Sequence, residues 1–192
     1  GIMAALHRGQ WIDHAAMSFT IFGQSVPNFF LGIILILVFS MTLRWLPSSG
    51  TGSFWHLLMP ALTLATTTAA TVARFTRSSM LDVLHQPFMR TAKARGIPHD
   101  RRVLRHALPN AAIPVVTVIG MRIGGLIGGA VTIETVFAWP GVGMLLVNSV
   151  NQRDLAVVLL IALTMVVVNL TVDLAYGWLD PRIELHNKKA TA

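Results

Sequence analysis

Long apolar stretches separated by short polar segments make up most of this 192-residue chain. About 20 consecutive apolar residues cross the hydrocarbon core of a bilayer as a helix, so a run of that length with few charges predicts a membrane span. We expect such helices at residues 22–46, 57–80, 110–133 and 155–179. The pattern predicts an all-α, polytopic integral membrane protein, with a single transmembrane domain over residues 1–192.

Positive charges are concentrated in one of the segments that connect these runs. Eight of the fifteen Lys and Arg residues lie between Arg74 and Arg105, against two Asp residues. The positive-inside rule therefore predicts a cytoplasmic segment at residues 84–109. The segments at 44–56 and 134–154 carry few basic residues and are expected to be extracytoplasmic, with both chain ends cytoplasmic.

Composition supports a membrane protein and excludes several other classes. Hydrophobic residues make up 54% and charged residues 12% of the chain, whereas about a quarter of the residues of soluble proteins are charged. The net charge of +7 follows from the cytoplasmic segments, and anionic lipid headgroups account for it without a nucleic-acid partner. The chain has no cysteine, no phosphate-binding loop and no histidine pair with metal-ligand spacing, so we expect no catalytic or metal site and no ATP binding by the chain itself.

The basic segment contains residues that typically begin and end helices, and it predicts two short helices. Pro87 suits a first helical position, and Gly96 falls where a left-handed C-terminal cap is needed. Pro98 then opens a second helix, with Asp100 in its first turn. Leu84, Phe88 and Ala92 recur at near-helical spacing and predict an apolar stripe that another surface has to cover.

This segment resembles the EAA loop of ABC importer permeases. The general form of that loop is Glu-Ala-Ala, three residues, Gly, nine residues, Ile, any residue, Leu-Pro. Ala92, Gly96, Leu108 and Pro109 match this form. Arg90, Thr91 and His106 depart from it in the way that is usual in the dipeptide, oligopeptide and nickel branch.

Two further stretches resemble the same branch. Residues 134–143 read Glu-Thr-Val-Phe-Ala-Trp-Pro-Gly-Val-Gly, and residues 179–183 read Leu-Asp-Pro-Arg-Ile. The resemblance implies a type I importer-like fold, with one more full helix, an extracytoplasmic segment and most of a second helix before this point in the family. We therefore expect the chain to be N-terminally truncated, with residues 1–6 forming the cytoplasmic end of that second helix.

The resemblance also implies the function and the partners. It predicts a permease subunit of the bacterial inner membrane that pairs with a second homologous permease, two cytoplasmic ATPases that bind ATP and Mg, and an extracytoplasmic binding protein. The cargo would be di- or oligopeptides, with nickel, glutathione and similar solutes close behind. The residues expected to couple to the ATPase are Leu84, Phe88, Arg90, Thr91, Ala92, Gly96, Leu108 and Pro109.

Four polar residues are candidates for the substrate pathway. Thr67 and Thr71 lie in a Thr- and Ala-rich run that faces protein or water better than lipid. Arg122 lies about mid-run, where a charge costs at least about 2.5 kcal/mol. It would either contact a carboxylate of the cargo or form a structural ion pair, for example with Asp173. Glu134, at the outer boundary, would be either a carboxylate of a gate loop or a cargo contact.

Glycines in the third run predict tight helix packing. They repeat at four-residue spacing and form a doubled small-residue ridge, which suits backbone-to-backbone contact with another helix. The ridge residues are Gly120, Gly124, Gly125, Gly128 and Gly129.

Two alternative functions remain open from the residues alone. A secondary transporter or channel would need interrupted helices with paired intramembrane carboxylates. A membrane-embedded hydrolase would need a nucleophile placed beside a base.

Overall fold

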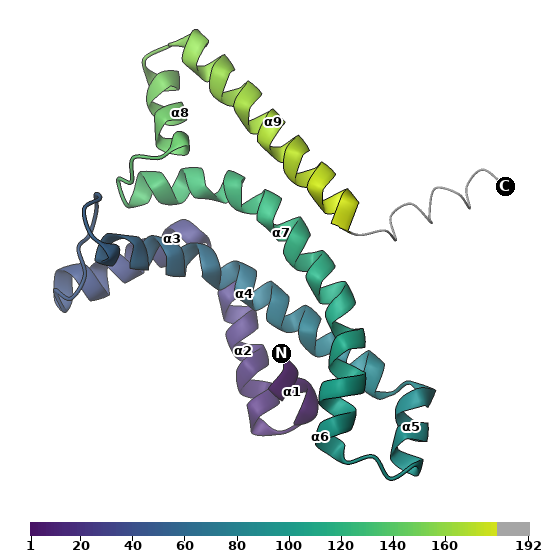
Figure 1. Cartoon of the computed structure of the whole chain (residues 1–192). Coiled ribbons are helices and arrows are strands. Elements are labelled where there is room, and N and C mark those ends of the chain that lie inside the picture. The colour runs from purple at the N-terminus through teal and green to yellow at the C-terminus, as the bar shows by residue number, and fades with distance from the viewer. Residues whose placement is uncertain (180–192) are drawn as a thin grey trace. The chain divides into compact units, whose positions relative to one another are not determined.

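The computed structural model describes the backbone of residues 1–179, and the side chains of these residues except 123–125, 127, 128, 173 and 175–179. Within this part of the chain every regular element is a helix (Figure 1), which confirms the all-α class. Two of the elements, η1 and η2, are π-helical. In chain order the elements are α1 (Ile2–Leu6), α2 (Trp11–Ser25), α3 (Asn28–Leu35), η1 (Ile36–Thr42), α4 (Phe54–Leu84), α5 (Pro87–Ala94), α6 (His99–Arg101), η2 (Arg102–Ala107), α7 (Leu108–Val136), α8 (Val142–Asn151) and α9 (Leu155–Leu179).

Three helical stretches among the described residues are long and apolar enough to cross a membrane. They are Phe54–Leu84, His99–Arg122 and Leu155–Val172. A fourth span is obtained if the bent pair Trp11–Ser25 and Asn28–Thr42 is counted as one. These stretches overlap the four predicted runs, but their limits differ from the predicted ones.

The first predicted helix, at 22–46, is not continuous. Residues 22–25 are the end of α2, and a bend of 102° separates that helix from the next one. Val26 has an extended backbone (φ −85°, ψ 122°), because the ring of Pro27 disfavours a helical conformation in the residue before it. Hydrophobicity alone could not reveal this break, since apolar residues continue on both sides of it.

The helices observed for the second and third predicted runs extend beyond the predicted limits, into the polar segment between them. The helix predicted at 57–80 extends over the whole of Phe54–Leu84. The third run is joined to the preceding short helix without a break, through the π-helical residues Arg102–Ala107. Pro109 lacks a backbone N–H, and the wider π turn before it lets the helix continue through this position.

The predicted extracytoplasmic loop at 134–154 contains helical structure, and its location outside the cytoplasm stays a prediction. Helix α7 continues to Val136, and the apolar helix α8 occupies Val142–Asn151 within the loop. Gly141 is the N-cap residue of α8. The run Val-Gly-Met-Leu-Leu-Val after Gly141 was the available sequence signal, but it is too short to stand out among the membrane spans.

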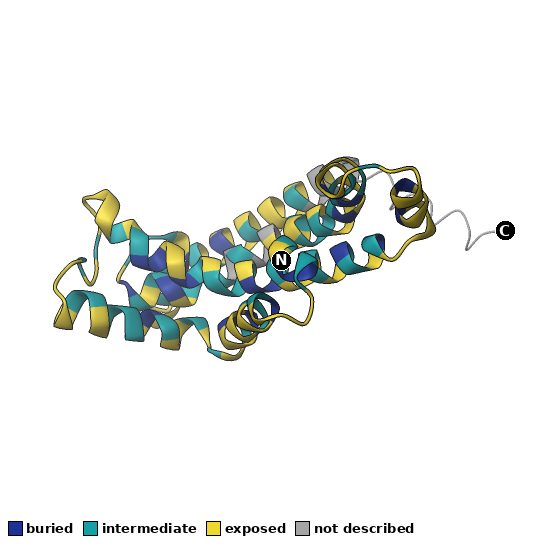
Figure 2. Ribbon diagram, turned by 90° about the horizontal axis from the view of Figure 1, so that it is seen from below, coloured by how far each residue is buried: buried dark blue, intermediate teal, exposed yellow. Residues whose placement is uncertain are grey.

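Contacts divide the chain into two units, each described by itself. Unit 1 comprises Gly1–Leu31 and Ala61–Ile119, and unit 2 comprises Gly32–Pro60 and the described residues from Gly120 onward. Buried positions form narrow patches on the helices, between broader exposed and intermediate surfaces (Figure 2). Large apolar residues are among the exposed ones, for example Leu155 at 73% and Leu159 at 69%. Such a surface is suited to contact with lipid.

Phe137 organises the part of unit 2 that includes the end of α7. Its side chain is 2% exposed, and a Cβ atom on Gly32 of α3 would lie 3.1 Å from its ring. The Phe137 carbonyl accepts a hydrogen bond from the Gly50 backbone N–H at 3.1 Å. The lack of a side chain at Gly32 therefore lets α3 pack closely against this residue.

Candidate functional site

Residues 87–107, here called the elbow, form the predicted helix-turn-helix. Pro87 lies in the first turn of α5, and Gly96 has the left-handed backbone (φ +73°) that the sequence predicted. The Gly96 N–H donates to the Lys93 carbonyl at 3.0 Å, and the Ile97 N–H donates to the Ala92 carbonyl at 3.2 Å. This pair of bonds is the Schellman motif, which satisfies the last carbonyls of a helix. The first short helix and the glycine cap are confirmed, whereas the second helix continues without a break into α7.

A cluster of buried apolar side chains holds the elbow to the neighbouring helices of unit 1. It contains Met89 from α5, Val103 and Ala107 from η2, and residues from α1, α4 and α7. Met80 of α4 is fully buried at 0% exposure, and burying a side chain of this size contributes about 1.5–3 kcal/mol. The cluster members are Ala5, Met80, Val83, Met89, Val103, Ala107 and Ala111.

The buried face of α5 differs from the predicted stripe. Met89 is 5% and Ala92 9% exposed, whereas Phe88 is 38% exposed. The spacing of Leu84, Phe88 and Ala92 suggested one continuous face, but α4 ends at Leu84 and α5 begins only at Pro87, so the two segments do not share a helical phase. The core therefore takes Met89 in place of Phe88, and the Phe88 side chain remains exposed on the elbow.

Small residues and one hydroxyl bring α4 and α7 together beside the elbow. Ala107 is 0% and Ala111 1% exposed, and the Ser79 hydroxyl donates a hydrogen bond to the Ala111 carbonyl at 2.9 Å. Leu84 and Leu108 pack against the same cluster. The predicted coupling residues Leu84, Ala92 and Leu108 thus lie at the base of the elbow, while Arg90, Thr91 and Gly96 are exposed.

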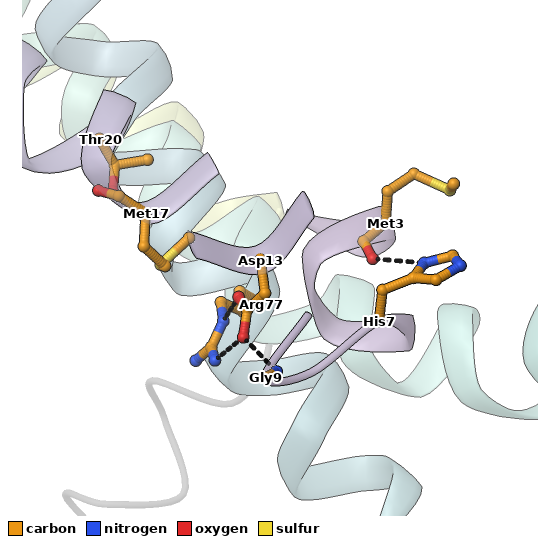
Figure 3. Close-up of polar contacts among 7 residues, drawn as sticks. All are labelled: Met3, His7, Gly9, Asp13, Met17, Thr20 and Arg77. Carbon is orange, nitrogen blue, oxygen red and sulfur yellow. Dashed lines mark hydrogen bonds and ion pairs between the residues drawn. The ribbon is translucent and has the colours of Figure 1, made fainter. Parts of the chain in front are cut away.

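An ion pair fastens α2 to α4 in the same unit (Figure 3). The Arg77 side chain donates from Nε to Asp13 Oδ1 at 2.5 Å and from Nη2 to Asp13 Oδ2 at 2.6 Å. The Gly9 backbone N–H donates to the same carboxylate at 3.0 Å. Asp13 is only 3% exposed, so its charge depends on these three bonds. The sequence analysis did not identify this pair, although Asp13 is the only carboxylate before Asp82 and was the available signal.

The two threonines predicted for the pathway lie inside unit 1. The Thr67 hydroxyl donates to Asn28 Oδ1 at 2.5 Å, beside the bend that follows α2. The Thr71 hydroxyl donates to the Thr67 carbonyl at 3.0 Å, and Thr71 is 2% exposed. These contacts give both residues a packing role in this chain. Their contact with cargo stays a prediction.

Arg122 and the glycine ridge lie on α7. Arg122 is exposed, and its expected partner Asp173 is outside the residues whose side chains are described, so both interpretations of Arg122 remain predictions. The side-chain surroundings of Gly124, Gly125 and Gly128 are likewise outside the described part. Gly120 and Gly129 are half-buried, and the packing role of the ridge also stays a prediction.

Glu134 has a structural contact within unit 2. Its Oε2 atom accepts the Met144 backbone N–H at 2.9 Å, in the first turn of α8. A Cβ atom on Gly141 would overlap the Glu134 carboxylate, and one on Gly143 would lie 2.5 Å from Val131 Cα. The two glycines therefore allow the start of α8 to pack directly onto α7. A carboxylate at a helix N-terminus is favoured by the helix dipole.

The core beneath the elbow includes side chains from five different elements. Among the described residues no group of His, Cys, Asp or Glu could hold a metal ion. Several helices in the described part of the chain are long and apolar enough to cross a membrane, and the fold is that of a polytopic α-helical membrane protein. The chain belongs to the family of binding-protein-dependent transport system inner membrane components, whose profile matches residues 1–185.

Curated permeases resemble almost the whole chain. It is 47% identical over 187 residues to the glutathione transport system permease protein GsiC of Escherichia coli (strain K12), and 46% identical over 187 residues to GsiC of Salmonella choleraesuis (strain SC-B67). Each alignment covers 95% of this chain and 61% of the relative, so the chain spans about three fifths of the length of these relatives. The predicted membership of the peptide and nickel permease branch is confirmed, as is a multi-pass location in the bacterial inner membrane.

Proposed function

We propose that this chain is the membrane-spanning permease subunit of an ATP-driven, binding-protein-dependent importer. A second homologous permease completes the pathway, and an extracytoplasmic binding protein delivers the cargo. Two cytoplasmic ATPase subunits bind ATP and Mg. One of them docks on the elbow of each permease. Family membership over residues 1–185 supports this assignment.

The observation that carries the proposal is the shared core of the elbow. Met89 on α5 packs with Met80 of α4, Val103 of η2 and Ala5 of α1. A displacement of α5 therefore moves the ends of several helices together, because a close-packed core transmits strain and does not deform continuously. When the ATPases close on ATP, the elbow shifts the bundle between inward-open and outward-open states.

The exposed face of α5 supplies the contact with the ATPase. Phe88 is an aromatic residue at 38% exposure, on a segment outside the membrane spans. Buried aromatic residues often dominate the free energy of protein interfaces. Phe88 is thus the anchor that enters a groove of the ATPase, with Arg90 and Thr91 beside it on the exposed surface.

Small peptide-like solutes are the proposed cargo. Glutathione is the first candidate to test, because GsiC of Escherichia coli, at 47% identity, is a glutathione transport permease. Di- and oligopeptides are the next candidates. Arg122 on α7 is proposed to meet a carboxylate of the cargo, and the half-buried Thr67 is proposed to contact the cargo from α4. The buried Thr71 would support Thr67 through its hydrogen bond to the Thr67 carbonyl.

The test is uptake by the purified importer in sealed vesicles, with labelled glutathione or dipeptide and with ATP supplied to the ATPases. We expect Phe88→Ser to reduce ATP-dependent uptake at least about tenfold, with little loss of thermal stability because the side chain is outside the core. Phe75→Ser is the matched control, since Phe75 lies on α4 at 44% exposure and away from the elbow.

Two results would contradict the proposal. One is wild-type uptake by the Phe88→Ser importer with both ATPases bound. The other is uptake driven by an ion gradient in vesicles that contain no ATPase, which would instead identify a secondary transporter.

A further inference from the structure

A small basic pocket lies in the inner angle of the elbow, between α5 and η2. Its volume is about 130 Å³. Leu84, Met89 and Val103 form an apolar floor that is continuous with the core beneath the elbow. The other lining residues are Arg90, Lys93, His99 and Arg102, and no carboxylate lines the pocket.

The charges in this pocket are not balanced by the described part of the chain. Three cationic residues and a histidine are among the residues that line it. The Nε atom of Arg102 is buried and has no hydrogen-bond partner among the described residues. A buried donor without a partner costs free energy, so an anion that accepts this bond would stabilise the elbow.

The lining of the pocket indicates which kind of anion suits it. The apolar floor of Leu84, Met89 and Val103 suits a short aliphatic stem, and the basic residues beside it suit a carboxylate at the end of that stem.

The position of the pocket favours a protein carboxylate over a lipid phosphate. Helix α4 acquires charged residues at Arg74, and Leu84 in the pocket floor lies ten residues further on, about 15 Å along the helix. The headgroup layer of one leaflet is only about 5–8 Å thick. If Arg74 lies at the inner edge of the hydrocarbon, the pocket lies beyond the headgroups, on the side where a cytoplasmic subunit binds.

We propose that this pocket receives an Asp or Glu side chain of the ATPase subunit that docks on the elbow. The inference rests on the proposed function and adds the chemistry of the partner surface. Phe88 provides the apolar anchor, while Arg90, Lys93 and Arg102 select an acidic residue beside it. Charge complementarity of this kind raises the association rate and fixes the register of the two surfaces.

Zero-length carbodiimide crosslinking tests this directly, because the reagent joins a lysine amine to a carboxylate only when the two are in contact. The chain contains three lysines, Lys93, Lys188 and Lys189, so a product at Lys93 is easily assigned by mass spectrometry. In the purified importer we expect an amide between Lys93 and an Asp or Glu of the ATPase. Lys93→Arg keeps the charge but has no primary amine, so this variant should not form the product.

Charge reversal measures the contribution of the pocket. We expect Lys93→Glu to weaken binding of the purified ATPase to the permease in nanodiscs at least about tenfold, and to reduce the salt dependence of binding. Arg101→Glu is the control, because Arg101 is exposed and does not line the pocket.

The outcomes distinguish a failure of this inference from a failure of the proposed function. If Phe88→Ser abolishes ATPase binding while Lys93→Glu behaves like Arg101→Glu, the proposed contact with an acidic residue is wrong. The proposed docking of the ATPase on the elbow is then retained. If neither variant changes ATPase binding, the proposed function fails as well. A Lys93 amide to Asp82 or Asp100 of this chain would overturn the inference. An effect of Lys93→Glu that appears only with phosphatidylglycerol in the nanodisc would assign the pocket to lipid and also overturn it.

Discussion

The elbow and the turn between α7 and α8 are both short reversals that depend on glycine, but different forces stabilise them. The elbow packs Met89, Val103 and Ala107 into a core shared with α1, α4 and α7. At the α7–α8 turn, the Glu134 carboxylate accepts one backbone N–H of α8, and the backbone at Gly143 packs against Val131. The elbow is thus held by apolar contacts with several helices, whereas the α7–α8 turn combines one buried aromatic side chain, Phe137, with a carboxylate bond and a close backbone contact.

The two turns therefore differ in how a single substitution should affect them. A packed core opens only with the unit that contains it, so backbone strain in the elbow should be felt by the helices that share its core. At the α7–α8 turn, loss of the carboxylate bond leaves the buried Phe137 in place, so its effect should be smaller. The substitutions below test whether the two turns differ in this way.

Removing the ion pair next to the elbow is expected to have the largest effect. In Arg77→Ala the Asp13 carboxylate, which is 3% exposed, loses both guanidinium bonds. A buried charge without its partner is strongly destabilising. We expect the lowest yield and the largest fall in Tm of all the variants described here, measured on detergent-purified protein.

Two comparisons make that experiment specific. Arg74→Ala removes an exposed arginine one turn earlier on α4 and should leave Tm nearly unchanged. The double variant Asp13→Asn with Arg77→Met removes both charges and should recover much of the lost stability, since removing both partners leaves no orphaned charge. Equal Tm values for Arg77→Ala and Arg74→Ala would show that the pair does not hold α2 to α4.

Straining the elbow is expected to have the next largest effect. Gly96 has φ +73°, and a Cβ atom added there would have no atom within 4 Å, so a larger residue causes backbone strain and not a collision. A β-branched residue in this conformation costs roughly 1–2 kcal/mol. We expect Gly96→Val to uncouple transport, with ATP hydrolysis retained and uptake reduced severalfold, measured on the same vesicles.

Gly50→Val is the control that distinguishes backbone strain in the elbow from backbone strain elsewhere in the chain. Gly50 has φ +87°, and a Cβ atom added there would likewise have no atom within 4 Å, but Gly50 lies between η1 and α4, outside the elbow. It should lower stability by a similar amount and leave the ratio of uptake to ATP hydrolysis unchanged. If both variants uncouple to the same degree, the elbow is not the transmitting part.

The main features of the elbow were predictable because they depend on neighbouring residues. Pro87 fixes the start of α5 and Gly96 its end, through backbone preferences that act within a few positions. The partner of each buried side chain was not predictable in the same way. The preference for Met89 over Phe88 depends on the helical phase of α5 relative to α4, which is set by the two residues between them.

Two other features required knowledge of tertiary contacts. Asp13 and Arg77 are 64 positions apart, and nothing in their local sequence pairs them. Helix α8 is ten residues long and lies in a predicted loop, because its start depends on the Glu134 carboxylate from the preceding helix. The four apolar runs were visible because length and hydrophobicity need no partner.

The smallest expected effect is at the α7–α8 turn, and it tests the two interpretations of Glu134. If the residue is a helix cap, Glu134→Gln keeps an acceptor for the Met144 N–H and loses only the charge at the α8 N-terminus, which costs about 0.3–1 kcal/mol. The KM for uptake should then be unchanged. Asp154→Asn is the matched control, because Asp154 Oδ1 accepts the Val157 N–H at 3.2 Å at the start of α9. A KM that rises tenfold or more in Glu134→Gln alone would instead show that this carboxylate contacts the cargo, and the α7–α8 turn would be part of the binding site and not only its support.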